Sequence, residues 1–286
     1  MHFLVKKRFI ILLPAIFFVI SASAQQDTAK LKNQFSIFNP TPESLLRDEI
    51  GADRPDETES PYTIDAGHFM YEADLFNYER QRTDEAIQST YLLHQANLKF
   101  GLTNTMDFQI KVQSYGRQRS RSISSGNVQS KSGFGDVILR LKQNLYGNDH
   151  GNVSFGCMAY VKLPTNNYSD NKEYEGGIII PLELKLPGEW KLGLQVEGDR
   201  LKDDVGNGMH TEFLQSAVIS HKVFKNLKGF LETYYTYDFK GHEWRNFIDM
   251  ALQYEISKKI MVDGGLYYGL QTQASKTYFF GLLVEI

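Results

Sequence analysis

The last ten residues of the chain alternate between apolar and polar side chains as far as the final residue. The apolar positions are Tyr278, Phe280, Leu282, Val284 and Ile286. Thr277 and Glu285 occupy the opposite face. A period of two is typical of a β-strand with one apolar and one polar face. In a soluble protein such a strand would leave an open sheet edge, whereas a closed barrel pairs it with the first strand, so the pattern favours a barrel.

Comparable alternation recurs in about twelve segments from Gly67 onward, each close to the 9–11 residues that a tilted membrane strand needs. The weakest segment, from Thr211 to Val223, places Gln215 and His221 on its apolar face. Five connections are short, and of the six that alternate with them four are longer and polar, while those at residues 240–243 and after Leu270 are short too. The five are residues 101–105, 147–151, 187–188, 224–228 and 257–259. Outer-membrane barrels have this alternation, with tight periplasmic turns and longer outer loops.

We therefore predict an all-β fold, a transmembrane antiparallel up-and-down β-barrel of about twelve strands over residues 67–286, with both chain ends periplasmic. A soluble β-sandwich would have no reason to keep the alternation of connections across so many hairpins. The long connection from Gly116 to Ser132 is predicted to be a solvated outer loop. Contact with anionic lipopolysaccharide is the alternative for its cations, which are Arg117, Arg119, Arg121 and Lys131.

The N-terminus carries the features of a secretory signal. Lys6, Lys7 and Arg8 precede an apolar run over residues 9–20, and Ala22-Ser23-Ala24 offers a cleavage site. This pattern predicts a signal peptide over residues 1–24, cleaved near Ala24, and a mature protein in the outer membrane of a Gram-negative bacterium. Cleavage removes three positive charges and changes the formal net charge from −3 to −6. The basic excess expected of a nucleic-acid partner is therefore absent.

Residues 25–66 are predicted to form a periplasmic segment that precedes the barrel. Thr41 as a helix N-cap and Pro42 at the first helical position predict one short helix from Pro42 to Ile50. An acidic stretch that contains Pro55 and Pro61 follows, and it has neither a helical nor a strand period. The two prolines and a single arginine among the acids suggest a defined shape for this stretch.

Several motifs resemble one family of outer-membrane channels, grouped under the meta-pathway of phenol degradation. The family's opening motif resembles Asp53-Arg54-Pro55-Asp56-Glu57-Thr58-Glu59-Ser60-Pro61 followed by Gly67-His68-Phe69. Further matches are Phe100-Gly101-Leu102-Thr103, Gly133-Phe134-Gly135-Asp136-Val137, Leu139-Arg140-Leu141 and Pro181-Leu182 before Trp190. The resemblance covers Pro42 to Ile286, although the terminal Ile286 departs from the usual Phe. It implies an outer-membrane β-barrel that takes part in uptake of small molecules, without identifying phenol as the solute.

Two groups of charged residues are candidates for the substrate path. The first is the acidic stretch, which could fold into the periplasmic mouth and form a constriction or could serve as a solvated tether. Its charged residues are Asp53, Arg54, Asp56, Glu57 and Glu59. The second group lies on the polar face of the predicted barrel and could line a wet channel or close it with ion pairs. Its members are Glu72, Asp74, Asp107, Lys111, Asp136, Arg140, Lys142, Glu183, Lys185, Glu197, Glu232, Asp249 and Asp263. Of these, the candidates for the substrate path are Asp107, Lys111, Asp136, Arg140 and Lys142.

The predicted function is passive passage of small solutes, among them small organic or aromatic compounds. The alternatives are a barrel enzyme that acts on lipids and a closed structural barrel. The histidines are scattered, and no G-x-S-x-G motif is present, so we predict no catalytic residues. There is no His-x-His, and Cys157 is the only cysteine, so we predict no metal site, cofactor or disulfide.

The predicted partners follow from the membrane location. They are outer-membrane lipid, lipopolysaccharide and an unidentified small solute. The outer-membrane assembly machinery is a further predicted partner, because the strand from Tyr278 to Ile286 resembles the C-terminal signal of outer-membrane proteins. Cys157 falls on the apolar side of its segment, where we expect a thiol that faces lipid or is buried.

Overall fold

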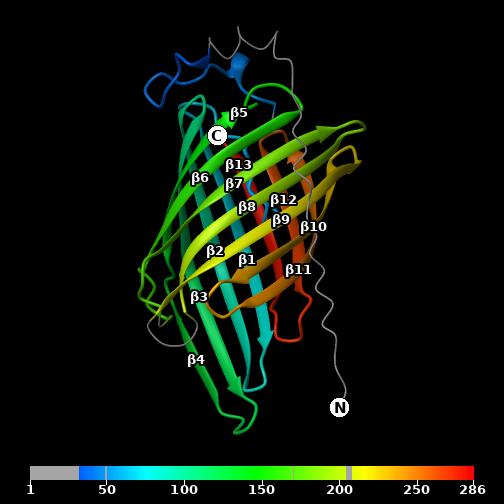
Figure 1. Ribbon diagram of the computed structural model, residues 1–286. Helices are drawn as coiled ribbons and strands as arrows, with labels where there is room; N and C mark the ends of the chain where they lie inside the picture. The colour runs from blue at the N-terminus through cyan, green and yellow to red at the C-terminus, as the bar shows by residue number, and fades with distance from the viewer. Residues whose placement is uncertain (1–31, 49, 170, 204–207) are drawn as a thin grey trace.

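The computed structural model describes residues 32–286 apart from 49, 170 and 204–207. The predicted signal peptide and its cleavage site lie outside the described residues. Figure 1 shows a barrel of tilted strands with the described part of the N-terminal segment at one end. The strands are β1 (Phe69–Arg82), β2 (Ala86–Thr103), β3 (Met106–Ser122), β4 (Val128–Gly133), β5 (Val137–Tyr146), β6 (Val153–Leu163), β7 (Glu175–Leu186), β8 (Trp190–Lys202), β9 (Met209–Phe224), β10 (Leu227–Asp238), β11 (Glu243–Ser257), β12 (Ile260–Gly269) and β13 (Lys276–Glu285).

The sheet closes on itself through β13 and β1. Every pairing is antiparallel, and in the β1–β13 pair Tyr71 lies opposite Val284 while Tyr78 lies opposite Tyr278. The Ile286 N–H extends the ladder by donating to the carbonyl oxygen of Phe69 at 2.8 Å. The predicted closed antiparallel barrel is confirmed. Closure satisfies the edge hydrogen bonds that an open sheet would leave exposed to lipid.

β4 and β5 share one neighbour, β3. The second half of β3 along the chain pairs with β4, from Gly116 opposite Gly133 to Arg121 opposite Val128. The first half, Met106 to Val112, pairs with β5, and β5 in turn pairs with β6. The closed circuit therefore has twelve strands, and β4 is an addition to it.

The connection from Gly116 to Ser132, predicted to be a solvated outer loop, contains strand residues that the sequence analysis did not predict. The segment is a β-hairpin, β3–β4, which projects beyond the barrel rim at the end opposite the N-terminal segment (Figure 1). Both faces of this hairpin are polar, because it stands clear of the apolar part of the barrel wall. Without an apolar face the sequence carries no period-two signal for a strand.

The two faces of the barrel wall reverse the distribution found in soluble proteins. Lys99 and Lys142 point into the barrel with no exposed surface, whereas Leu231 and Leu252 point outward and are 51% and 54% exposed. An apolar outer face and a polar interior are the arrangement expected of a membrane barrel. Within the described residues, no helix is long and apolar enough to cross a membrane.

Aromatic side chains gather at the two ends of the apolar outer face, as the membrane–water interfaces favour. Those toward the end with the N-terminal segment include Phe69, Phe100, Tyr146, Phe155 and Trp190. Those toward the opposite end include Tyr78, Tyr91, Tyr278, Tyr235 and Trp244. Short turns also cluster at the first end.

The weakest predicted strand is the regular strand β9, and its two polar outward residues both have partners. Gln215 accepts a hydrogen bond from the Tyr235 hydroxyl at 2.6 Å. His221 stacks on Trp190 with ring centroids 4.2 Å apart. Cys157 lies on the outward face of β6 and is a free thiol, as its position in the alternation predicted.

The predicted helix from Pro42 to Ile50 is wrong. Only Glu43–Leu45 forms a short 3-10 turn, and Leu46 is already extended, with φ −61° and ψ 150°. The reason is a competing set of tertiary hydrogen bonds at Arg47. Its N–H donates to Asp65 at 2.9 Å, and its guanidinium Nη1 donates to the Thr63 carbonyl at 2.9 Å. These long-range bonds outweigh the local helix propensity, which is a weak determinant of structure.

Candidate functional site

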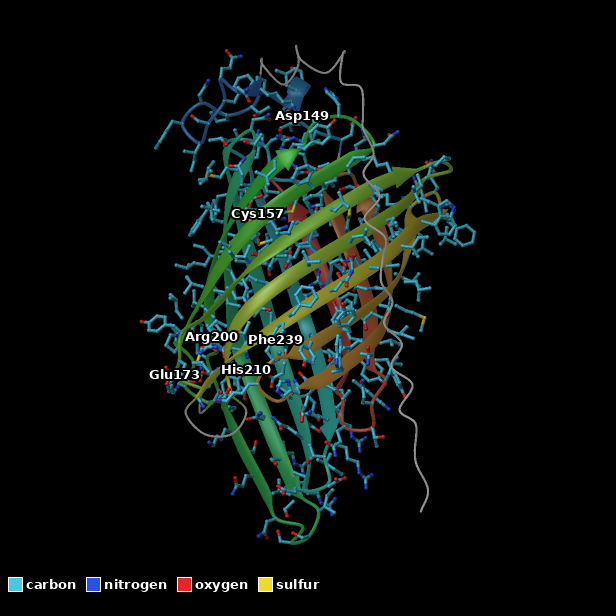
Figure 2. All side chains as sticks on the ribbon, in the orientation of Figure 1. Asp149, Cys157, Glu173, Arg200, His210 and Phe239 are labelled. Carbon is cyan, nitrogen blue, oxygen red and sulfur yellow. The ribbon has the colours of Figure 1, made fainter. Side chains whose placement is uncertain are left out.

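The N-terminal segment enters the barrel from the end with the short turns, where a cluster of charges holds it. Asp149, in the turn between β5 and β6, lies at that end in Figure 2. Its carboxylate receives Arg47 Nε at 2.9 Å and Lys32 Nζ at 3.0 Å. Burial alone would raise the pKa of Asp149, but Arg47 and Lys32 hold the pKa below its usual value. The charged pairs fix the point at which the chain turns into the lumen.

Asp53 is the first residue of the segment with partners from three strands. Its carboxylate forms ion pairs with Lys99 of β2, at 2.6 Å, and with Lys142 of β5. Gln109 of β3 donates to it at 3.3 Å. Burial alone would raise the pKa of Asp53, but the attraction of Lys142 and Lys99 holds the pKa well below its usual range. Lys99 also contacts Glu72 of β1 at 2.9 Å.

Arg54 contacts the neighbouring part of the wall, on the other side of β1. One guanidinium nitrogen lies 2.6 Å from Asp74 of β1, and the other lies 2.6 Å from Asp263 of β12. The guanidinium also lies over the Phe279 ring of β13, 5.7 Å from its centroid. A Cβ at Gly281 would lie 1.9 Å from the Arg54 guanidinium, so the glycine leaves the space that this side chain fills.

Residues 57–59 are tied to the remaining side of the barrel. Glu232 of β10 accepts hydrogen bonds from the N–H groups of Glu57, at 2.8 Å, and Thr58, at 2.9 Å. Glu59 forms an ion pair with Arg140 of β5. The Glu59 N–H donates to Gln195 of β8 at 2.7 Å.

Together these contacts stretch the segment from Asp53 to Glu59 across the interior of the barrel. It bonds to strands on opposite sides of the lumen, which are β1, β2, β3, β5, β8, β10 and β12. Wall side chains accept the N–H groups of Asp53, Glu57, Thr58 and Glu59, and they pair with the charges of Asp53, Arg54 and Glu59. A solvated tether would make few such contacts.

The structure brings most of the predicted site residues together but not all of them. Asp107 accepts the Ile64 N–H at 3.1 Å, and Lys111 is on the inward face of β3. Asp136 lies apart, in the break between β4 and β5, where Asn166 donates to it at 2.8 Å and Lys162 pairs with it at 3.4 Å. It does not contact the N-terminal segment.

Two residues central to this network were absent from the predicted site. Lys99 bridges Asp53 and Glu72, and Gln195 receives the Glu59 N–H. Both fall on the polar side of an alternating segment, so period two alone could have identified them as lumen residues. What the sequence could not show is which lumen residue the N-terminal segment would contact.

A cavity of about 470 Å³ lies beside the segment at the end of the barrel that has the short turns. Its wall is formed by residues of β7 to β12 and, from the N-terminal segment, by Asp48, Ile50 and part of residues 52–62. The lining carries charges of both signs and three aromatic residues, and includes Asp56, Tyr62, Glu183, Trp190, Lys228 and Phe230. Such a mixture of apolar and polar groups suits a small organic solute.

One histidine contact that the sequence did not predict lies on the outer face. His94 Nδ1 is 2.7 Å from Ser114 Oγ, and His94 Nε2 is 2.7 Å from the Tyr71 hydroxyl. In hydrolases a carboxylate contacts the second ring nitrogen of the catalytic histidine and stabilises the imidazolium. Here the uncharged hydroxyl of Tyr71 takes that position beside His94. Among residues 32–286 that are described, no cluster of side chains suited to hold a metal is found.

Several solved structures are similar to this chain, and the first of the three that follow supports the fold. An outer membrane channel from Pseudomonas putida F1 matches with a TM-score of 0.60 and 12% identity, over 82% of this chain and 100% of that chain. The NanC porin matches with a TM-score of 0.49 and 10% identity, over 76% and 100%. The translocator domain of the autotransporter NalP from Neisseria meningitidis matches with 0.49 and 11%, over 77% and 88%.

Comparison with curated proteins finds no match. A family model, in contrast, matches residues 52–284, which include the segment from Asp53 to Glu59 and every strand except the last residue of β13. The resemblance seen in the sequence motifs is thereby confirmed. The chain belongs to the family described as Putative MetA-pathway of phenol degradation.

Proposed function

We propose that the protein is a passive channel for small solutes, in which the segment from Asp53 to Glu59 forms the constriction. The observation that carries this proposal is the placement of a non-strand segment across a charged lumen inside a wall with an apolar outer face. Fixed charges at a narrow point select what passes through a pore. The cavity beside the segment supports small organic compounds as the solute class.

The bonds that hold the segment favour a constriction that can open. They are ion pairs and hydrogen bonds, which water entering the lumen can replace, whereas the apolar core of the described residues is a small cluster around Ile64, Met70 and Leu283. We propose that displacement of residues 53–59 joins the periplasmic cavity to the rest of the lumen.

The location proposed for this channel is the outer membrane of a Gram-negative bacterium, reached after cleavage of the signal peptide near Ala24. The strand from Tyr278 to Ile286 is the proposed recognition element for the assembly machinery. Lipid of the outer membrane, including lipopolysaccharide, is the proposed partner of the apolar outer face. The girdles of aromatic residues support this placement.

Single-channel recording of the refolded protein in a planar bilayer tests the proposed function. We expect small, stable steps of conductance, because the segment narrows the lumen without apolar sealing. An insulating bilayer at protein levels that insert would contradict the channel. The same refolded sample serves the comparison of variants described below.

A second candidate, hydrolysis of lipid esters, is favoured only by the contact between His94 and Ser114. Fatty-acid release from phospholipid vesicles by the refolded protein, lost in Ser114→Ala, would support it. We expect no release above the Ser114→Ala background, since Tyr71 supplies no negative charge to the imidazole.

The constriction should open as the pH rises. Burial, together with Glu232, raises the pKa of Glu57 to about 7, and the same two causes raise the pKa of Asp56 well above its usual value. Groups with raised pKa values stabilise the docked segment at low pH, and this stabilisation is lost as the pH rises through about 4.5 to 7. Lys111 and Arg140 oppose the shift at Glu57 without cancelling it.

We therefore expect conductance to increase from pH 5 to pH 8. In the double variant Asp56→Asn/Glu57→Gln, which keeps both side chains uncharged, conductance should stay near its low-pH level. Asp53 does not contribute to this change, since its pKa is held low and its carboxylate stays ionised throughout. A wild-type curve that is flat, or one that falls with pH, would show that these carboxyls do not control docking.

A further inference from the structure

A row of tyrosines marks the outer boundary of the apolar surface on β13, β1 and β2. Tyr278, Tyr78 and Tyr91 are register neighbours across the three strands, with ring centroids 6.5 Å and 4.9 Å apart. Tyr278 faces outward, since its neighbour Phe279 is buried in the lumen over Arg54. Tyrosine prefers the interface between hydrocarbon and headgroups. Residues beyond this row therefore lie at headgroup height.

Cations occupy the outward positions immediately beyond the tyrosines. Arg117 is the register partner of Tyr91 and continues the tyrosine row onto β3. The next outward row consists of Lys276, Arg80, Ser89 and Arg119, on β13, β1, β2 and β3 in that order. The row after that joins Arg82, Ile87 and Arg121. The set, which we name the outer basic patch, is Arg80, Arg82, Arg117, Arg119, Arg121 and Lys276.

The geometry of the patch follows from the sheet. Successive outward residues of one strand lie about 7 Å apart, and residues on alternate strands about 10 Å apart. All five arginines are exposed. Lys276 lies over the Tyr268 ring, 4.3 Å from its centroid, so its ammonium is held against the wall at the same level.

The patch differs from the lumen in having no acidic partners. Among the described residues no carboxylate forms an ion pair with any of its five arginines, and the outward positions between them are serines and Ile87. Arg117 donates instead to the Ser130 hydroxyl at 3.2 Å. In the lumen, by contrast, Lys99, Lys142 and Arg140 all pair with acids of the N-terminal segment.

We propose that the outer basic patch binds the phosphate groups of lipopolysaccharide in the outer leaflet. Guanidinium groups match phosphate with two parallel hydrogen bonds, and five of the six cations are arginines. The tyrosine row beside the patch would contact the acyl chains of the same lipid. Uncompensated positive charge next to a lipid-facing wall suits an anionic headgroup that carries more than one phosphate.

The test compares two triple variants of equal charge change. Arg80→Gln/Arg119→Gln/Arg121→Gln removes three cations of the patch, and Lys225→Gln/Lys258→Gln/Lys259→Gln removes three exposed cations of the periplasmic turns. Binding of bisphosphorylated lipid A to each refolded protein is measured in detergent by native mass spectrometry. We expect the patch variant to bind roughly a hundredfold more weakly, since each cation near an anionic lipid surface contributes about fivefold. The turn variant should bind like the wild type.

Two lipid controls identify the recognised group. Dephosphorylated lipid A and phosphatidylglycerol should both bind the wild type more weakly than bisphosphorylated lipid A does. Equal binding of either lipid, or an unchanged affinity of the patch variant, would overturn the proposal. If the triple variant does not refold, as judged by heat-modifiable migration, Arg119→Gln alone, with a loss of about fivefold, decides the question. None of these outcomes depends on whether the barrel conducts.

Discussion

A protein that lacks residues 25–61 should fold into bilayers and conduct several-fold more current per channel than the full mature chain. The deletion removes the segment from Asp53 to Glu59, which crosses the lumen between Asp74 and Asp263 on one side and Arg140 on another. The strands begin only at Phe69, and the closing pair of β13 with β1 does not involve the deleted residues. The barrel wall should therefore survive the deletion.

A shorter deletion, of residues 25–30 alone, is the matched control, and it should conduct like the mature protein. Conductance in planar bilayers and heat-modifiable migration in gels are measured on the same samples. Equal conductance of the long deletion and the mature chain, with both folded, would show that the crossing segment does not obstruct the pore.

Asp53→Ala should convert the constriction into an anion-preferring one and loosen the segment. The substitution leaves Lys142 without its acidic partner, while Lys99 keeps only Glu72. The two lysines have no exposed surface, and loss of one partner of a buried pair costs about 3–5 kcal/mol. Uncompensated positive charge at the narrowest point should attract anions.

The measurement is the reversal potential in a salt gradient, which should shift toward the anion for Asp53→Ala. The shift should be larger at low salt, because screening weakens as the Debye length grows beyond about 10 Å. Asp84→Asn, at the exposed end of the β1–β2 hairpin, makes the same change of charge away from the lumen and should leave selectivity unchanged. A cation preference retained by Asp53→Ala would assign selectivity to other wall residues.

The outcome at Arg47 shows why local signals failed in the N-terminal segment. Thr41 and Pro42 are good helix-starting residues, yet the chain is extended by Leu46, because Arg47 is held by Asp65, Thr63 and Asp149. Each of those partners is more than ten positions away along the chain. A sequence window of helical length does not contain them.

The β3–β4 hairpin was not predicted from the sequence, for a different reason. A strand was predictable only where one of its faces meets lipid, since that is the condition that produces alternation between apolar and polar residues. Beyond the tyrosine row both faces of β3 are polar, and the backbone ladder from Arg117 opposite Ser132 to Arg121 opposite Val128 continues without a sequence signal.

What the sequence determined by itself is the barrel wall, its short turns and the family to which the chain belongs. Each wall residue faces either lipid or the lumen, and the two environments alternate along every strand. The resulting period of two can be recognised without knowledge of distant residues. The tertiary structure alone decided the site. Arg54 and Asp263 are 209 positions apart and meet only because the closed wall surrounds the N-terminal segment. Their pairing depends on the register of every strand between them, which no local pattern encodes.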